Sequence, residues 1–191
     1  MTTDTLRPPA GTVARRATEI LTAIKADPEY RAFETATLEY SSDWECFTGF
    51  PVISQWHLEK DAPALLEEGL RALVLKAAVY EMTGDEHAAE IPVAVPVDEM
   101  SHAMIAQPQL LARITARVGV SVIHQTDQEH TDYRHGDYTH AAYIAAWGEP
   151  PERYWISHEE TERRRAHLAT RYASIGLRRS GREHSIDFAT V

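Results

Sequence analysis

The stretch EKDAPALLEEGLRALVLKAAVYEM, residues 59–82, decides the fold of this chain. Its apolar side chains recur every three or four positions, which places them on one broad face of an α-helix. That face consists of Leu65, Leu66, Leu70, Leu73, Val74, Ala77 and Ala78. Gly84 follows and is expected to end the helix, because glycine readily adopts the left-handed conformation found after helices. So wide an apolar face must be covered by other elements of the same fold.

Helical spacing of apolar residues also dominates the rest of the chain. Further helices are expected at about 12–27, at 29–40, from Asp98, from Pro108, at 138–147 and at 157–175. The connector 90–97 contains Pro92 and Pro96, which predict an extended conformation. Because alternating strand patterns are nearly absent, we predict an all-α fold, a single helical bundle of about six to eight helices, some of them interrupted.

The length of 191 residues favours one domain with a substantial core. Residues 1–11 contain Pro8, Pro9 and Gly11 and are expected to form a flexible N-terminal lead. The helical bundle is predicted to span 12–177. The remaining segment, 178–191, is expected to be a loose C-terminal tail.

Charge and cysteine content narrow the class of protein. A net charge of −10 argues against nucleic acid as a partner, because phosphate binding depends on an excess of Lys and Arg. No segment approaches the roughly 18 to 20 apolar residues that span a bilayer, so no membrane contact is expected. The single cysteine, Cys46, cannot form an internal disulfide, and a reducing cytoplasm is the expected location.

The fragment DEMSH, residues 98–102, combines carboxylates and a histidine at helical spacing. Residues three apart share one helix face, so Glu99 and His102 could direct an oxygen and a nitrogen at the same ion. The alternative is an ordinary helix start. In that interpretation Asp98 is the N-cap, Glu99 interacts with the helix dipole, and His102 packs or hydrogen-bonds.

DEMSH resembles the DExxH motif of ferritin-like and haem-oxygenase-like carboxylate di-iron proteins, which include bacterial arylamine N-oxygenases. The resemblance implies a helix bundle whose interior holds two iron or manganese ions and activates dioxygen. It also implies that other helices supply further glutamates and a second Glu-x-x-His element. The match covers these five residues closely and their helical context loosely.

The family spacing places the first glutamate at Glu67 or Glu68. Glu68 lies in the middle of its helix, however, whereas Glu99 lies at the start of its own. The start of one helix lies beside the end of its antiparallel neighbour. This geometry favours Glu81 as the partner of Glu99, with His87 just beyond it.

Residues 124–140, HQTDQEHTDYRHGDYTH, contain three successive Asp-x-x-His units. They are Asp127 with His130, Asp132 with His135, and Asp137 with His140. A five-residue repeat advances about 140° per step on a helix, so the three units cannot all face one ion. Asp137 and His140 are followed by apolar residues and are the most core-directed pair. A solvated polar face is the alternative.

The last predicted helix opens with SHEETERRRAHLATRY, in which His158 and Glu162 stand four residues apart. In the N-oxygenases the closing motif is a glutamate followed three residues later by a histidine. Here that position is Arg165, a departure from the pattern. The missing ligand then comes from His140 or His167, or the two-metal site is incomplete. The alternative for this segment is an exposed helix face.

Four aromatic residues, Trp44, Phe47, Phe50 and Trp56, lie close to His57 in a segment without a clear period. Packing on the core is one interpretation. The other is the wall of a small-molecule pocket, because such pockets combine aromatic walls with few polar groups.

The leading hypothesis is a non-haem, di-iron oxidoreductase that acts on a small molecule, of the kind used in biosynthetic pathways. The expected cofactor is iron or manganese. The sequence does not decide whether the protein forms a homodimer. The expected metal ligands are Glu81, Glu99, His102, Asp137, His140, His158 and Glu162. Of these, His102, His140 and Asp137 are expected to be catalytic. The residues expected to line a substrate pocket are Trp44, Phe47, Trp56 and His57. A metal-free enzyme with a His/carboxylate pair as general acid-base, for a cyclisation, elimination or hydrolysis, is one alternative. A non-catalytic bundle that binds a small molecule or a partner is the other.

Overall fold

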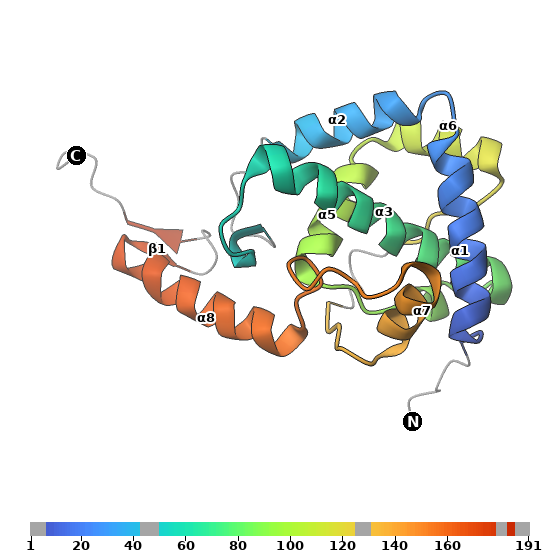
Figure 1. Ribbon diagram of the computed structural model, residues 1–191. Coiled ribbons are helices and arrows are strands. Elements are labelled where there is room, and N and C mark those ends of the chain that lie inside the picture. Colours follow the sequence, from blue (N-terminus) through green and yellow to red (C-terminus); the bar gives the residue numbers. More distant parts are fainter. Residues whose placement is uncertain (1–6, 43–49, 125–130, 179–182, 186–191) are drawn as a thin grey trace.

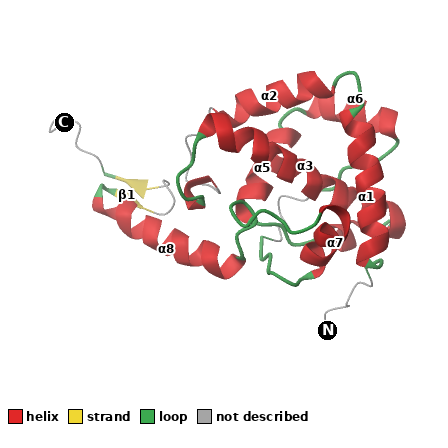
Figure 2. Cartoon of the chain, viewed as in Figure 1, coloured by secondary structure: helices red, strands yellow, loops and turns green. Residues whose placement is uncertain are grey.

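A computed structural model describes residues 7–42, 50–124, 131–178 and 183–185 (Figure 1). Within these residues the chain forms eight α-helices, one 3₁₀ turn and a single pair of very short strands (Figure 2). The predicted all-α bundle of six to eight helices is confirmed. No helix among the described residues has the length and apolarity needed to cross a membrane.

The elements follow one another in this order: α1 (Ala10–Lys25), α2 (Tyr30–Ser42), the 3₁₀ turn η1 (Phe50–Val52), α3 (Leu58–Thr83), α4 (Glu86–Ala89), α5 (Val95–Ile105), α6 (Pro108–Val118), α7 (Tyr138–Trp147), α8 (His158–Ser174), β1 (Leu177–Arg178) and β2 (Glu183–His184). The helix bounds lie close to those expected for α1, α2, α3, α7 and α8. Helix α4 was not expected. It begins after Asp85, whose side chain accepts a hydrogen bond from the backbone N–H of His87.

The core forms around α3, which packs against α1, α2, α4, α5 and α7. The apolar side chains expected along this helix are buried. A glycine, Gly69, allows α5 to approach closely. A Cβ at that position would lie 3.1 Å from Met100 Cγ and 3.2 Å from Met104 Cε, tighter than most real contacts. Helix α3 also carries buried polar residues, among them Glu68 and Lys76, into the interior.

Helix α5 begins three residues earlier than expected, at Val95 rather than Asp98. Pro96 lies in its first turn, where a proline is tolerated because that N–H needs no partner within the helix. The prediction that Asp98 caps the helix is therefore wrong. Its backbone N–H donates to Ala94 O at 2.9 Å, and its side chain lies inside the first turn.

Helix α8 extends away from the rest of the bundle (Figure 1) and buries only Thr161. It contacts η1 and β1. Strand β1 pairs with β2 in antiparallel register, Leu177 opposite His184 and Arg178 opposite Glu183. This strand pair begins at the end of the predicted bundle and continues into the segment expected to be a loose tail. Gly176 precedes it with a φ of 84°, and its carbonyl accepts a hydrogen bond from Ser185 N–H.

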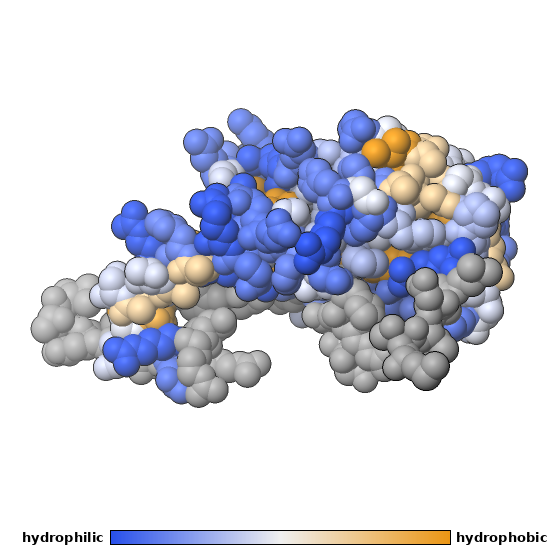
Figure 3. Space-filling view, turned by 90° about the horizontal axis from the view of Figure 1, so that it is seen from below, coloured by the Kyte–Doolittle hydropathy of each residue, from blue (hydrophilic) through white to orange (hydrophobic). Residues whose placement is uncertain are grey.

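The face of the molecule seen in Figure 3 is mainly hydrophilic over its described residues, and hydrophobic residues appear there in scattered patches. Large exposed apolar side chains are few among the described residues, Ile175 being 60% exposed.

Candidate metal centre

Asp98, His102 and His124 form a group whose possible ligand atoms all lie within 4.8 Å of one another. His102 Nε2 lies 3.7 Å from Asp98 Oδ2, and His124 Nδ1 lies 4.0 Å from Asp98 Oδ1. The two imidazole rings meet edge to face, with centroids 4.7 Å apart. Among the described residues, no other set of three or more His, Cys, Asp or Glu side chains has a geometry that could hold one metal ion. We call it the Asp98 group.

Two different segments of the chain supply the residues of the Asp98 group. Asp98 and His102 stand four residues apart on α5 and therefore lie on the same helix face. His124 follows α6, which ends at Gly119 in the left-handed conformation, φ 77°. The chain then runs without helix through 120–124, and Ile123 enters the core beside His124. Long-range folding thus brings an imidazole to a carboxylate 26 positions earlier.

Burial makes the group unusual. The side chains of His124, Asp98 and His102 are 2%, 7% and 22% exposed. Burial, together with the nearby charge of Lys76 and with His102, lowers the pKa of His124 from 6.5 to about 3. The ring is therefore neutral at physiological pH, the form in which histidine binds metals. Its Nε2 is buried and has no hydrogen-bond partner among the described residues.

A buried ion pair lies next to this group. Lys76 Nζ on α3 is 2.6 Å from Glu90 Oε2, and both side chains are almost completely buried. The same ammonium is 3.4 Å from His124 Nδ1. Because Glu90 balances Lys76, the Asp98 carboxylate leaves the region with an excess negative charge, which favours a cation.

The donor types suit a divalent transition metal. One carboxylate and two imidazoles form the set with which non-haem iron is commonly bound, and zinc also accepts it. Ligand atoms about 2.1 Å from one ion lie about 3 Å apart. The separations of 3.7 and 4.0 Å, and the limit of 4.8 Å for the whole group, therefore require an inward movement of the side chains, and His124 Nδ1 would also have to turn away from Lys76 Nζ. The residues present fit a metal ion.

Glu99, the predicted neighbour of His102, remains close to the group. Its Oε2 lies 3.8 Å from His102 Nδ1, and its side chain is 17% exposed. Glu81 lies elsewhere. It is largely exposed near the end of α3 and accepts a hydrogen bond from Arg16 Nε at 2.9 Å. The structure thus keeps Glu99 with His102 and does not bring Glu81 to them.

Asp137 and His140 form a local structure at the start of α7. Asp137 is the N-cap, and its carboxylate accepts hydrogen bonds from the backbone N–H groups of His140 and Arg134. His140 Nδ1 accepts from Gly136 N–H at 2.9 Å, and its ring stacks on His135. The pair satisfies the backbone of a helix start and does not join the Asp98 group. Asp127 and His130, the first Asp-x-x-His unit, lie outside the described residues.

The predicted ligands on α8 are also apart from the Asp98 group. The backbone N–H of His158 donates to Tyr133 O at 2.9 Å. Glu162 is exposed and forms an ion pair with Arg165 at 3.2 Å. These contacts are those of a helix start and of a solvated helix face.

Two of the predicted pocket residues, Trp44 and Phe47, lie outside the described residues. Trp56 is partly buried and packs against the hydrophobic core. His57 is exposed and precedes α3, where its backbone N–H donates to Asp61 Oδ2 at 2.7 Å. The described part of this aromatic segment therefore packs on the bundle, and the pocket prediction stays untested.

His124 was missed because the apolar spacing of Val118 and Val122 suggested that the preceding helix continued. The available signal was Gly119 followed by VSVI, a glycine stop and then β-branched residues that favour an extended chain.

Glu68 was considered on spacing and set aside on geometry. It is buried in a second polar cluster with Arg71, Tyr143 and Trp155, which we call the Glu68 cluster. Glu68 Oε2 accepts hydrogen bonds from Tyr143 OH at 2.7 Å and from Trp155 Nε1 at 2.8 Å. Its Oε1 accepts from Arg71 Nη1 at 3.0 Å.

In comparisons of this chain with protein-family models, with curated proteins and with solved structures, nothing matches.

Proposed function

We propose that this protein is a metal-dependent oxidoreductase that acts on a small molecule, with one iron or manganese ion bound by Asp98, His102 and His124. A single observation carries the proposal. Two imidazoles and one carboxylate, contributed by α5 and by the segment after α6, lie buried with ligand atoms within 4.8 Å of one another.

The energetic cost of the arrangement supports a functional role. A buried polar atom without a partner costs about 1 to 3 kcal/mol, and His124 Nε2 is such an atom among the described residues. An apolar side chain of similar size would avoid that cost. Buried, perturbed titratable groups that do not improve the fold are typical of functional sites.

The donor set is compatible with iron or manganese, as it is with zinc. Three protein ligands leave coordination positions open for a substrate or dioxygen, and no cysteine contributes. When bound, iron would supply one-electron chemistry and the activation of dioxygen. The chain would hold the ion with three side chains, exclude water by the burial of Asp98 and His124, and leave access beside the more exposed His102.

The two-ion site implied by the DExxH resemblance needs more ligands than the Asp98 group contains. Glu99, 3.8 Å from His102 Nδ1, is a described carboxylate next to the group. Glu81, Asp137 and Glu162 are engaged in other contacts. The proposal is therefore made for one ion.

The test is metal content after reconstitution. Chelator-treated protein is loaded anaerobically with Fe(II), desalted and analysed for iron, with parallel samples loaded with Mn(II) and Zn(II). We expect one iron per wild-type chain and loss of that iron in His124→Gln and in Asp98→Asn. His87→Ala is the matched control, because His87 is exposed and its side chain lies in no part of the group. Wild-type protein that retains no more iron than His124→Gln contradicts the proposal.

Redox chemistry needs a second measurement on the iron-loaded protein. Exposure to air should oxidise the Fe(II) bound to the wild-type protein faster than the same concentration of Fe(II) added to a solution of His124→Gln, followed with an Fe(II) chromophore after acid release. Retention of zinc alone, without retention of iron, would support a metal site and contradict the oxidative function.

One observation favours a second candidate, a metal-free general acid-base site. Lys76 is only a donor, so at 3.4 Å it places the proton of the neutral His124 ring on Nε2. With a pKa of about 3, His124 is too weak a base near neutral pH, so in this candidate His102, whose Nε2 lies 3.7 Å from Asp98 Oδ2, exchanges the proton with the substrate. This candidate predicts that no metal is retained, so the same reconstitution separates it from the first.

A further inference from the structure

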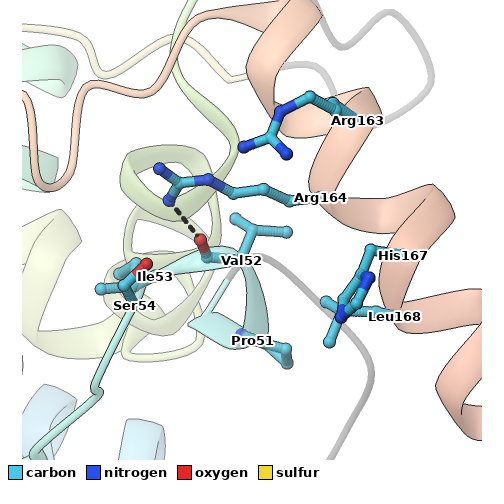
Figure 4. Close-up of a pocket in the computed structure, with 8 residues that line it drawn as sticks. All are labelled: Pro51, Val52, Ile53, Ser54, Arg163, Arg164, His167 and Leu168. Atoms are coloured by element: carbon cyan, nitrogen blue, oxygen red, sulfur yellow. Dashed lines mark hydrogen bonds between the residues drawn. The ribbon is translucent and has the colours of Figure 1, made fainter.

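A pocket of about 330 Å³ lies between η1 and α8 (Figure 4). Val52 and Ile53 line it from the η1 side. Arg163, Arg164, His167 and Leu168 line it from α8. None of these residues belongs to the Asp98 group or the Glu68 cluster, so the pocket is a separate feature of the fold.

The spacing on α8 explains why these side chains converge. Arg163 and His167 are four residues apart, and so are Arg164 and Leu168. The two pairs are adjacent rows of one helix face, and this face is turned toward η1 (Figure 4). The pocket therefore has a cationic and imidazole-bearing wall on the helix, and its accessible apolar surface comes from the partly buried Pro51 and Leu168, because Val52 and Ile53 are almost completely buried.

Hydrogen bonds hold the guanidinium groups of Arg163 and Arg164 in place. Glu160 accepts hydrogen bonds from Nε and Nη2 of Arg163 and from Nε of Arg164, each at 2.6 Å. Arg164 Nη1 donates to Val52 O at 2.6 Å, as the dashed line in Figure 4 shows. One carboxylate thus faces two guanidinium groups, and an excess positive charge remains at the pocket in a chain whose net charge is −10.

Some N–H donors of Arg163 and Arg164 are still available to a ligand. An arginine side chain has five N–H donors. No described residue accepts a hydrogen bond from Nη1 of Arg163 or from Nη2 of Arg164. Paired planar guanidinium groups are well suited to carboxylate and phosphate oxygens, and charge-assisted hydrogen bonds of this kind are about twice as strong as neutral ones.

We propose that this pocket binds a small organic anion, a carboxylate or phosphate monoester with a compact apolar body. The anionic group lies against Arg163 and Arg164, and the apolar body lies against Pro51 and Leu168. The volume is at the small end of the range for ligand pockets, which limits the ligand to about the size of one ring or a short chain. This inference is independent of the metal centre.

The test is an NMR titration of the full-length chain with four probes. Benzoate and phenyl phosphate represent the two anionic groups, benzamide lacks the charge, and inorganic phosphate lacks the apolar body. We expect saturable shifts of the amides of Val52, Ile53 and Leu168 with benzoate or phenyl phosphate. The better of these two should bind at least about tenfold more tightly than benzamide and inorganic phosphate. Which of the two binds more tightly identifies the anionic group. Equal binding of benzamide, or of inorganic phosphate, overturns the proposal, as does the absence of shifts with both organic anions.

Arg163→Gln is the decisive variant. The Arg163 side chain is 71% exposed and contacts Glu160 alone among the described partners, so the fold should be unchanged. We expect affinity for the organic anion to fall by about tenfold. Arg164→Gln should weaken it as well, but this change also removes the hydrogen bond to Val52. The matched control is Arg165→Gln on the same helix, because Arg165 pairs with Glu162 and does not line the pocket. Equal affinity in Arg163→Gln and Arg165→Gln overturns the assignment.

Discussion

Two buried polar clusters lie beside the central helix α3, and they differ in how their hydrogen-bonding groups are used. In the Glu68 cluster both oxygens of the carboxylate accept hydrogen bonds, from Arg71, Tyr143 and Trp155. In the Asp98 group the three side chains approach within 4.8 Å, yet His124 Nε2 has no described partner. The Glu68 carboxylate joins elements together through hydrogen bonds to both of its oxygens, although Arg71 Nε is buried without a hydrogen-bond partner among the described residues. We propose that the buried imidazole of His124 is arranged for a ligand.

The elements joined by each cluster support this difference. The Glu68 cluster connects α3 to α7 and to Trp155, which precedes α8, and it places Arg71 over the ring of Trp147. The Asp98 group connects α5 to the segment after α6 and adjoins the Lys76–Glu90 ion pair. The first cluster should therefore determine stability, and the second should determine ligand binding. The following predictions test that comparison, from the largest expected change in the free energy of unfolding to the smallest.

Glu68→Ala should lower the free energy of unfolding by about 3 to 5 kcal/mol, because it leaves two buried donors, Tyr143 OH and Trp155 Nε1, without their acceptor and removes one of the two carboxylates that pair with Arg71. Urea denaturation of the metal-free protein measures the change. Glu81→Ala is the matched control on the same helix. Glu81 is 46% exposed and pairs with Arg16, and such an exposed pair contributes about 0 to 1 kcal/mol. Equal losses in the two variants would contradict a structural role for the Glu68 cluster.

Addition of Fe(II) or Mn(II) should stabilise the wild-type protein by about 2.7 kcal/mol when the free metal concentration is one hundred times its Kd. The physical reason is that the ion binds the folded Asp98 group and not the separated side chains of the unfolded chain. Anaerobic thermal unfolding with and without metal measures this, and a chelator should reverse the gain. The prediction is contradicted if His124→Leu is stabilised as much as wild type.

Acid should destabilise the metal-free protein through His124. Its pKa is about 3 in the folded chain against 6.5 for the ordinary side chain, so the unfolded state binds the proton more readily. The stability contributed by neutral His124 is present above about pH 6.5 and is lost as the pH falls toward 3. The groups that face the ring are Lys76 from α3 and Asp98 and His102 from α5.

Between about pH 7.5 and about pH 5.5 the expected loss is about 1 kcal/mol. Urea denaturation of chelator-treated protein at the two pH values measures it. His124→Leu should show a smaller pH dependence by that amount, and His87→Leu, at an exposed position, should behave as wild type. An unchanged pH dependence in His124→Leu would exclude His124 as its source.

His124→Leu should change the stability of the metal-free protein at neutral pH by less than about 1 kcal/mol, in either direction. The substitution removes a buried polar atom that lacks a described partner, and Lys76 keeps its ion pair with Glu90. The same variant should lose metal binding. A loss of stability as large as that of Glu68→Ala would show that the imidazole supports the fold rather than a ligand.

Local periodicity was enough to predict much of the bundle. Helix α7 was expected at about 138–147 and runs from Tyr138 to Trp147, and α3 was expected at 59–82 and runs from Leu58 to Thr83. In these segments the apolar spacing and the flanking capping residues agree. The start of α5 was misjudged because Pro96 was taken to exclude a helix, although a proline fits its first turn.

The candidate site was predictable only in part, because only part of it depends on local spacing along one helix. The spacing of residues on one helix is a local property, so the placement of Glu99 beside His102 followed directly from the sequence, whereas Asp98 was expected to cap the helix and was missed as a member of the group. The identity of the third ligand depends on where the chain turns after Gly119 and how the segment 120–124 packs on α5. Spacing also suggested Glu81, Asp137 and Glu162, which the structure places in an ion pair with Arg16, in a helix cap and in an ion pair with Arg165.

The sequence by itself determined the helical class, most helix bounds and the candidacy of His102, because these depend on interactions between residues three or four positions apart. Only the tertiary structure decided that His124 joins Asp98, that Glu68 is bound by Tyr143 and Trp155, and that α8 and η1 enclose a cationic pocket. These three features depend on contacts between residues distant along the chain. Such contacts are set by the packing of whole helices around α3, which no local spacing encodes.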